Sequence, residues 1–245
     1  MIVLFTDFGA DDIYVAQLKA AILQHAPGGA TLLDLLHKAP NFNAKASANL
    51  LSALQHHFPP SAVFLAVVDP GVGSSRDPIY LEADGKRFIG PDNGLLSVIA
   101  ARAVETKIHR ITWRPPGMST SFHGRDLFAP IAAWLAGGIL SSEKMEEKSQ
   151  LSIQFRPDDL AEVIYVDHYG NVLTGIRAQD LPSDTVVEIK KHRLIHSRIF
   201  AEAPVGHAFW HKNSLNLLEI AVNQDNAAKC LGIQIGDPIK LTKSK

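Results

Sequence analysis

Short apolar runs alternate with helical patterns through the first half of the chain. Residues 2–5, 31–36 and 62–68 are apolar enough to predict buried strands. Between them, residues 11–25 and 43–57 carry apolar side chains at the spacing of a helix face. This order predicts an α/β domain with a mainly parallel sheet flanked by helices, which binds its ligands beyond the carboxyl ends of the strands.

The second half of the chain has a different pattern. Segments 161–176, 184–195 and 236–241 are short, rich in β-branched residues and interrupted by turns, so they predict a small antiparallel β-barrel domain. The polar segment 138–156 predicts a boundary helix and a linker. We therefore expect an N-terminal α/β domain over 1–150 and a C-terminal barrel over 157–245.

Composition narrows the classes of partner. The formal charge of −1, from 24 Lys and Arg against 25 Asp and Glu, gives no electrostatic signal for binding nucleic acid or an anionic membrane. A small molecule is the expected partner. Cys230 is the only cysteine, which excludes a disulfide within the chain and fits a reducing cytoplasm. We expect neither a leader peptide nor a membrane span, because no apolar stretch approaches about 20 residues.

Acidic residues follow two of the predicted strands. Asp7 comes directly after the first strand, and Asp11 or Asp12 is a suitable N-cap for the following helix. This leaves Asp7 free to accept hydrogen bonds from a ribose diol, as acidic residues do in dinucleotide-binding folds. A purely structural role for Asp7 stays open as the alternative.

The segment AVVDPGVGSSRDP, residues 66–78, places Asp69 at a strand end and Arg76 seven positions later. Asp and Pro are common turn formers, so a simple turn is one reading. Gly71 and Gly73, however, remove side chains where another group must approach the backbone closely. Stability is a poor reason for the arginine, since a surface ion pair contributes only about 0–1 kcal/mol.

Two later segments also contain candidate residues. Asp92 and Asn93 precede a glycine and an apolar helix, so a turn explains most of the pattern, with a ligand contact as the alternative. Phe122 and His123 precede another apolar helix. His123 is the stronger candidate, because an imidazole can donate and accept protons near neutral pH.

Six blocks in chain order resemble the S-adenosylmethionine hydroxide adenosyltransferases, the adenosine-forming S-adenosylmethionine hydrolases related to fluorinases and chlorinases. The blocks are TDFG at 6–9, VDPGVG at 68–73 with Arg76, GPDNGLL at 90–96, FHGRDLFAP at 122–130, VDHYGN at 166–171 and NSLNLLEIAVNQDNAAKCLG at 213–232. The halogenating relatives lack the Asp-Pro-Gly-Val-Gly segment, and the fluorinase has a halide-binding serine where this chain has Gly124. The resemblance is therefore to the branch that uses water.

The resemblance implies an α/β domain followed by a small β-barrel, in a homotrimer with each active site between the N-terminal domain of one subunit and the C-terminal domain of the next. It implies attack of water on ribose C5′ of S-adenosylmethionine, which forms adenosine and methionine without a metal or cofactor. The implied catalytic residues are Asp69, Arg76 and His123. The implied substrate-binding residues are Asp7, Asn93, Phe122, Asp167, Tyr169, Asn171, Ser214 and Ala227.

Two other functions use the same residues differently. Asp7, Asp69, Asp92 and His123 could ligate a divalent cation for hydrolysis of a phosphoester or nucleotide. Alternatively, the chain could be a non-catalytic sensor that binds adenosine or S-adenosylmethionine. Loss of activity in chelator would favour the first, and tight binding of adenosine with negligible turnover would favour the second.

Overall fold

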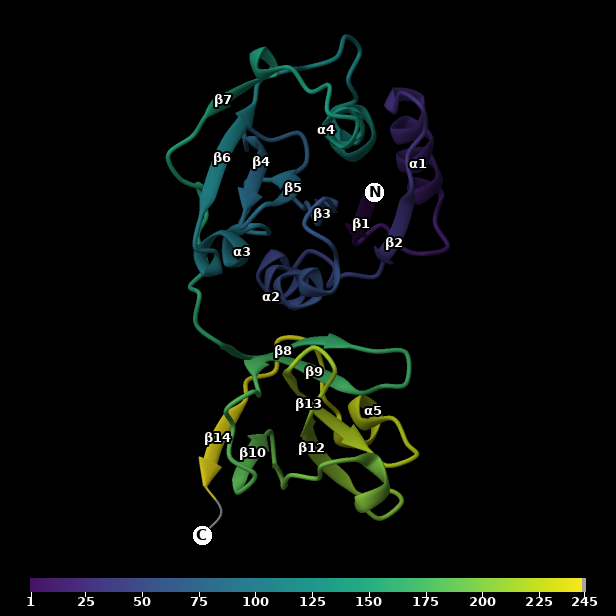
Figure 1. Ribbon diagram of the computed structural model, residues 1–245. Helices are drawn as coiled ribbons and strands as arrows, with labels where there is room; N and C mark the ends of the chain where they lie inside the picture. The colour runs from purple at the N-terminus through teal and green to yellow at the C-terminus, as the bar shows by residue number, and fades with distance from the viewer. Residues whose placement is uncertain (244–245) are drawn as a thin grey trace. The chain divides into compact units, whose positions relative to one another are not determined.

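The computed structural model describes residues 1–243 and separates into two compact units. The first unit is Met1–Pro157, and the second begins at Asp158. The first contains a large sheet with helices on both faces, and the second consists mainly of short antiparallel strands (Figure 1). The change of pattern along the sequence therefore corresponds to a change of architecture.

The sheet of the first unit has seven strands in the order β2-β1-β3-β5-β4-β6-β7. Their bounds are β1 Ile2–Thr6, β2 Leu32–Leu36, β3 Val63–Val67, β4 Pro78–Ala83, β5 Lys86–Pro91, β6 Thr106–Ile111 and β7 Met145–Glu147. Strand β1 pairs in parallel with β2 and β3, and β3 pairs in parallel with β5. The pairs β4–β5, β4–β6 and β6–β7 are antiparallel.

The sheet is therefore mixed, and the prediction of a mainly parallel sheet is wrong for its second half. The physical reason is a tight hairpin at Asp84 and Gly85, which have φ values of +46° and +79°. Two residues with positive φ make the turn that joins antiparallel strands most readily. This Asp-Gly signal reverses the chain between β4 and β5, where a parallel connection would need a long crossover.

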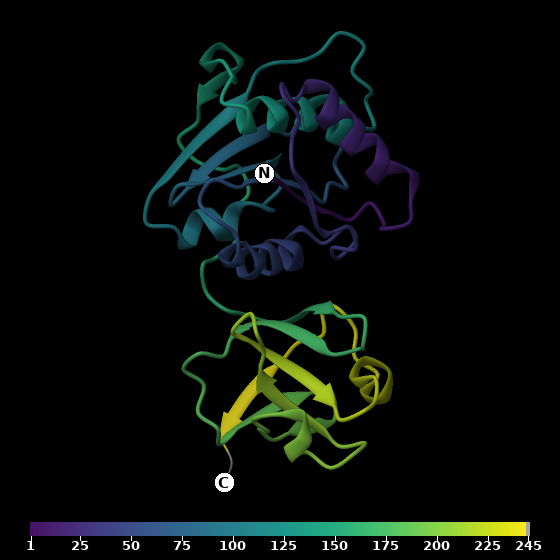
Figure 2. The same cartoon turned by 45° about the vertical axis from the view of Figure 1, so that its right-hand side comes forward.

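Helices cover both faces of this sheet. Helices α1 Ile13–His25 and α4 Ala129–Ala136 lie over one face, and α2 Ala44–Leu54 and α3 Ser97–Arg102 lie over the other (Figures 1 and 2). Helix α1 begins after Asp12, whose carboxylate accepts a hydrogen bond from the backbone N–H of Ile13 at 2.6 Å. This confirms one of the two predicted N-caps.

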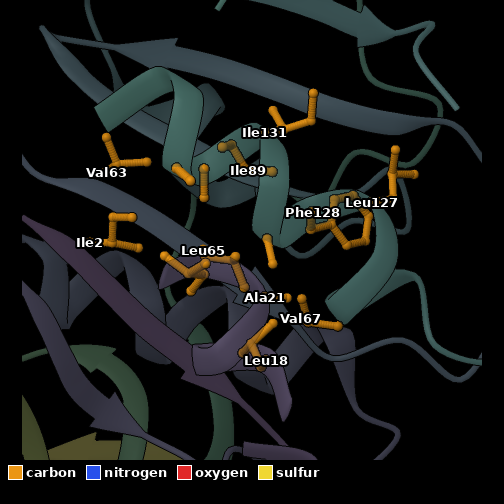
Figure 3. Packing of buried hydrophobic residues seen from close by; sticks show 14 of the residues in the cluster. Ile2, Leu18, Ala21, Val63, Leu65, Val67, Ile89, Leu127, Phe128 and Ile131 are labelled. Carbon is orange, nitrogen blue, oxygen red and sulfur yellow. The ribbon is translucent and has the colours of Figure 1, made fainter. Parts of the chain in front are cut away.

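The core between the sheet and helices α1 and α4 fixes the ends of the strands. Leu65 of β3 packs in one buried cluster with Leu18 of α1 and Ile131 of α4 (Figure 3). Phe128 belongs to the same cluster and is fully buried. Because β1 and β3 are both buried here, their carboxyl ends are held rigidly.

Two predictions for the first unit need correction. Strand β2 is an edge strand with partly exposed side chains, such as Leu33 at 38% exposure, and is not buried as expected. The segment 138–156 contains no boundary α-helix. It forms a 3₁₀ turn at Ser142–Lys144 and then β7, where Arg110 of β6 forms an ion pair with Glu146. Pairing with the sheet edge satisfies its backbone better than a short, isolated polar helix would.

The second unit contains two antiparallel sheets, ordered β11-β10-β14 and β12-β13-β9-β8. Their strands are β8 Leu160–Val166, β9 Val172–Arg177, β10 Thr185–Ile189, β11 His192–Leu194, β12 Ala208–Lys212, β13 Leu217–Val222 and β14 Lys240–Lys243. The short helix α5 Ala227–Leu231 follows β13. The predicted antiparallel domain is present, while closure into a barrel stays a prediction. Within residues 1–243, no helix is both long and apolar enough to cross a membrane.

Replacement of Leu65 by alanine tests the importance of this core. Leu65 is fully buried, so we expect Leu65→Ala to reduce the free energy of unfolding by about 2–5 kcal/mol through lost burial and a residual cavity. Urea denaturation followed by circular dichroism measures the change. The control is Val104→Ala, at a position 93% exposed, for which we expect no significant change. Equal stability of the two variants would contradict the packing described.

Candidate active site

The carboxyl ends of β1 and β3 bring two acidic residues to the same edge of the sheet. Asp7 follows β1 directly, and Asp69 stands two residues after β3. The backbone N–H of Asp7 donates to the carbonyl of Val67 at 3.3 Å, which ties the two strand ends together. Their neighbouring positions follow from the parallel pairing of these strands, as expected for this class of sheet.

Asp69 and Arg76 form a buried, bidentate ion pair. Nε of Arg76 donates to Oδ1 of Asp69 at 2.7 Å, and Nη2 donates to Oδ2. Their side chains are only 4% and 8% exposed, respectively, so this is not the surface pair that a short turn would suggest. Nη1 of Arg76 is buried and has no protein hydrogen-bond partner among the described residues. The N–H groups of Nη1 therefore still require an acceptor.

His123 completes a cluster of three. Nη2 of Arg76 lies 3.3 Å from Nδ1 of His123. A guanidinium can only donate, so Nδ1 accepts and the proton of the neutral ring lies on Nε2. Burial lowers the pKa of His123, and the charge of Arg76 lowers it further. Both effects favour the neutral imidazole that this hydrogen bond requires.

A local irregularity presents His123 to the cluster. Residues Gly124–Phe128 form a π-helical turn (η2) that leads directly into α4. Single π turns within helices occur frequently at functional sites. The ring of Phe128 lies 5.7 Å from the guanidinium carbon of Arg76, so the same turn also covers the ion pair.

Gly73 explains how the two loops approach each other. Its φ of +82° is in the left-handed region, and a Cβ atom there would lie 2.5 Å from the carbonyl oxygen of Thr120. The predicted close approach is therefore an approach by the protein's own backbone. Because Thr120 precedes His123 by only three residues, the absence of a side chain at Gly73 allows His123 to reach Arg76.

Asp7 has a different electrostatic environment. Burial raises its pKa above the ordinary 3.8, and the charge of Asp69 raises it further, whereas a hydrogen bond from the backbone of Phe42 lowers it. Phe42 is a residue that the sequence did not single out. Its side chain is 78% exposed and its φ is +58°, an unusual combination for a bulky residue. Only the structure distinguishes it from an ordinary core aromatic.

An aromatic group lies beside the cluster. Phe122 makes edge-to-face contacts with Phe8 and Tyr14, with ring centroids 5.7 and 5.4 Å apart, respectively. The guanidinium of Arg125 lies 5.0 Å from the centre of the Phe122 ring. Phe122 therefore has a defined orientation next to His123, while its predicted contact with substrate stays a prediction.

Asn93 and Asp92 are engaged within the protein. The amide of Asn93 donates to the carbonyl of Val68 at 2.8 Å and accepts from the backbone of Leu95, so it braces the residue before Asp69. The carboxylate of Asp92 accepts from Ser152 and lies 3.5 Å from Nζ of Lys148. Within residues 1–243, no three His, Cys, Asp or Glu side chains are grouped to hold a metal ion. The alternative ligand set that included Asp92 is therefore not assembled.

In the second unit, the predicted residues form a tight loop between β8 and β9. The carboxylate of Asp167 accepts from the backbone N–H groups of Tyr169 and Asn171 at 2.9 and 2.8 Å, respectively, and from the Asn171 side chain. Asp167 therefore closes the loop. Tyr169 is 75% exposed, whereas Asn171 is buried.

This loop borders a cavity of about 600 Å³. The cavity is lined by Tyr169, Asn171, Phe200, Val222, Asn223, Gln224, Asp225 and Asn226. Ala227 is fully buried directly after this lining. Ser214 lies elsewhere, because it is exposed in the turn before β13, whereas the cavity borders the residues that follow β13. The structure thus groups Tyr169 and Asn171 but does not bring Ser214 to the same cavity.

Comparison with protein families gives two matches that together cover nearly the whole chain. Residues 2–146 match the SAM hydroxide adenosyltransferase N-terminal domain, and residues 161–240 match the corresponding C-terminal domain. The chain is 36% identical to an (R)-S-adenosyl-L-methionine hydrolase of Thermus thermophilus, covering 96% of this chain and 97% of the relative. It is 34% identical to a hydrolase of the same name from Salinispora arenicola, covering 97% and 95%, respectively.

More distant and structural relatives agree with these matches. A fluorinase from Actinoplanes is 23% identical over all of this chain and 98% of the relative. A solved structure of an uncharacterized conserved protein from Thermotoga maritima is similar, with a TM-score of 0.90 and 32% identity over 99% of this chain and 100% of the other. The similarity thus extends through both units of the chain.

The ion pair predicts how His123 responds to a change at Arg76. Because the charge of Arg76 lowers the pKa of His123, we expect Arg76→Gln to raise that pKa, helped by the carboxylate of Asp69 that it leaves unpaired. Titration of the His123 ring by NMR measures the shift. Arg114→Gln is a milder control, since Arg114 acts on His123 only through a smaller charge effect. A pKa that stays constant or falls in Arg76→Gln would contradict the described coupling.

Proposed function

The chain belongs to the SAM hydroxide adenosyltransferase family, and on this premise we propose that it hydrolyses S-adenosylmethionine to adenosine and methionine at the Asp69–Arg76–His123 cluster. The observation that carries the assignment of residues is the buried Nη1 of Arg76, which has no hydrogen-bond partner in the described part of the chain, beside an otherwise complete ion pair. Leaving such a donor unsatisfied costs about 1–3 kcal/mol. A water molecule held there as the nucleophile would satisfy it.

The reaction itself defines what the protein must supply. The water oxygen bonds to ribose C5′ while the bond from C5′ to sulfur breaks, and the bonding electrons leave with the sulfur. Methionine departs as a neutral thioether, so the leaving group needs no acid. Alignment of reactants can lower the activation free energy by about 7–11 kcal/mol. General acid–base assistance typically accelerates a reaction by 10²–10⁴-fold, which corresponds to only about 3–5 kcal/mol. Positioning of the water is therefore the larger task.

The three residues divide this task. Arg76 donates from Nη1 to the water oxygen, and His123, which accepts from Nη2, fixes the direction of the guanidinium. The oxygens of Asp69 retain lone pairs beyond those used by Arg76, so Asp69 accepts the proton that the water loses, relayed by a second water because Asp69 lies on the other side of the guanidinium from Nη1. The resulting hydroxide has three lone pairs, of which one faces Nη1 of Arg76 and another attacks C5′.

The remaining predicted residues bind the substrate in this proposal. Asp7 holds the ribose hydroxyls, and Asn93 and Phe122 border the same edge of the sheet. In the second unit, Asp167, Tyr169 and Asn171 face the adenosyl or methionyl part, with Ser214 and Ala227 as further contacts. The proposed reaction requires neither a metal nor a cofactor, since S-adenosylmethionine supplies its own activated leaving group.

We also propose a homotrimer in which the first unit of one subunit and the second unit of the next form each site. The support is that the catalytic cluster lies wholly in Met1–Pro157, whereas the cavity beside Tyr169 lies wholly in the second unit. A ring of identical subunits can join two such different surfaces. The exposed thiol of Cys230 fits a cytoplasmic location.

Incubation with S-adenosylmethionine in ¹⁸O-labelled water tests the reaction. We expect labelled adenosine and methionine by chromatography and mass spectrometry, with no effect of chelator. Asp69→Asn should reduce kcat by about 10²–10⁴-fold while affinity for adenosine is retained, because the proton acceptor is lost but the ribose site is not. Unlabelled adenosine, or dependence on a metal, would overturn the proposal.

Mixing two inactive variants tests the shared site. Asp69→Ala disables the first unit and Tyr169→Ala the second, so each alone should have little activity. If sites form between subunits, trimers that are reassembled from an equal mixture should regain activity at about a quarter of their sites. If each site lies within one chain, mixing restores nothing. Mixtures of Asp69→Ala with His123→Ala, both in the first unit, are the control and should remain inactive.

A further inference from the structure

A chain of hydrogen bonds runs from the surface, at Lys19 and Asp34, to the turn that carries Asp7. His37 follows β2 directly and is 6% exposed. Its Nδ1 lies 2.8 Å from Oγ1 of Thr6, and its Nε2 lies 3.1 Å from Oδ1 of Asp34. Oδ2 of Asp34 accepts from Nζ of Lys19 at 2.6 Å. None of these four residues belongs to the catalytic cluster or to the predicted substrate-binding set.

The direction of each hydrogen bond follows from the chemistry of the groups. An ionised carboxylate only accepts, so Nε2 of His37 donates to Asp34. Hydrogen bonds from Lys19 and His37 lower the pKa of Asp34 despite the opposing effect of burial, which favours this ionised form. In a neutral ring, Nδ1 must then accept, and the hydroxyl of Thr6 donates to it. The same hydroxyl oxygen accepts from the backbone N–H of Phe8 at 3.3 Å.

The backbone of His37 contacts the other side of the same turn. The N–H of Gly9 donates to the carbonyl of His37 at 2.7 Å. His37 thus binds the turn through its ring at Thr6 and through its carbonyl at Gly9, on both sides of Asp7. The backbone N–H of Asp7 is itself bonded to Val67 of β3. These three contacts fix the backbone of the turn, and with it the position from which the side chain of Asp7 extends.

This arrangement has more polar groups than strand pairing requires. Strands β1 and β2 are already joined by parallel pairing over Ile2–Phe5. Burying an imidazole and a hydroxyl is unfavourable unless both are fully hydrogen-bonded, and a satisfied buried network favours one defined conformation. A carboxylate fixed before the ligand arrives binds it with a smaller loss of conformational entropy.

We propose that His37 is a positioning residue for substrate binding, which acts through Thr6 to orient the carboxylate of Asp7 toward the ribose hydroxyls. This inference rests on the ribose-binding role proposed for Asp7. It assigns to His37 no contact with substrate. Its effect should therefore appear in affinity for ribose-containing ligands and in KM, with kcat nearly unchanged.

Binding of adenosine to the full chain, measured by isothermal titration calorimetry, tests the proposal. Thr6→Val removes the hydroxyl with little change of shape, and we expect about fivefold to tenfold weaker binding, the value of one buried hydrogen bond. Thr6→Ser keeps the hydroxyl and is the matched control, with affinity close to that of the unchanged protein. His37→Phe should resemble Thr6→Val. Because His37→Phe also removes a buried polar group, Thr6→Val provides the decisive comparison if that variant does not fold.

A double-mutant cycle separates positioning from general destabilisation. Asp7→Asn should weaken adenosine binding, and adding Thr6→Val to it should cause little further loss, because the carboxylate that Thr6 orients is gone. Equal affinity of Thr6→Val and Thr6→Ser would overturn the role of His37 while leaving that of Asp7 intact. The role of His37 would also be overturned if the double variant lost affinity by the product of the two single losses. Unchanged affinity in Asp7→Asn would overturn the ribose role of Asp7, and the inference with it.

Discussion

The buried ion pair between Asp69 and Arg76 is the interaction on which the candidate site depends. Removing both charges from water costs several kcal/mol per ion, and only a bidentate geometry with further hydrogen bonds offsets that cost. Arg76 meets this condition with Asp69 and His123, yet its Nη1 has no partner among residues 1–243. A pair selected only for stability would not leave a buried donor unsatisfied. The arrangement is instead consistent with a site that is completed by a small polar molecule.

The surrounding structure keeps this pair in place. The side chain of Asn93 braces Val68 just before Asp69, and Gly73 lets the backbone at Thr120 approach so that His123 reaches the guanidinium. The π turn at Gly124–Phe128 then places Phe128 over the pair. On the adjacent strand, His37 holds the turn that carries Asp7. Strands β1 and β3 thus present two carboxylates in different environments. Asp69 is paired with Arg76, whereas the pKa of Asp7 is raised.

The second unit has a simpler physical basis. Its predicted residues lie on a loop closed by the carboxylate of Asp167, and Gly170 in that loop has no room for a side chain because Asn226 occupies the space. Contact between this loop and the start of α5 explains why two blocks distant in the sequence border one cavity. Ser214 does not share this position, since β13 separates its turn from the cavity.

Local chemistry was readable from the sequence. The apolar strands that end in Asp7 and Asp69, the cap at Asp12 and the two-domain change of pattern all depend on residues close together in the chain. The Asp84–Gly85 hairpin was not predicted, because the alternating pattern before it suggested more parallel strands than the sheet contains, although Asp-Gly is a strong local hairpin signal. Tertiary structure alone decided that Arg76 meets His123, 47 positions away, and that His37 meets Thr6, 31 positions away. Such contacts depend on how strands and loops pack in space, which hydrophobic periodicity and turn signals do not encode.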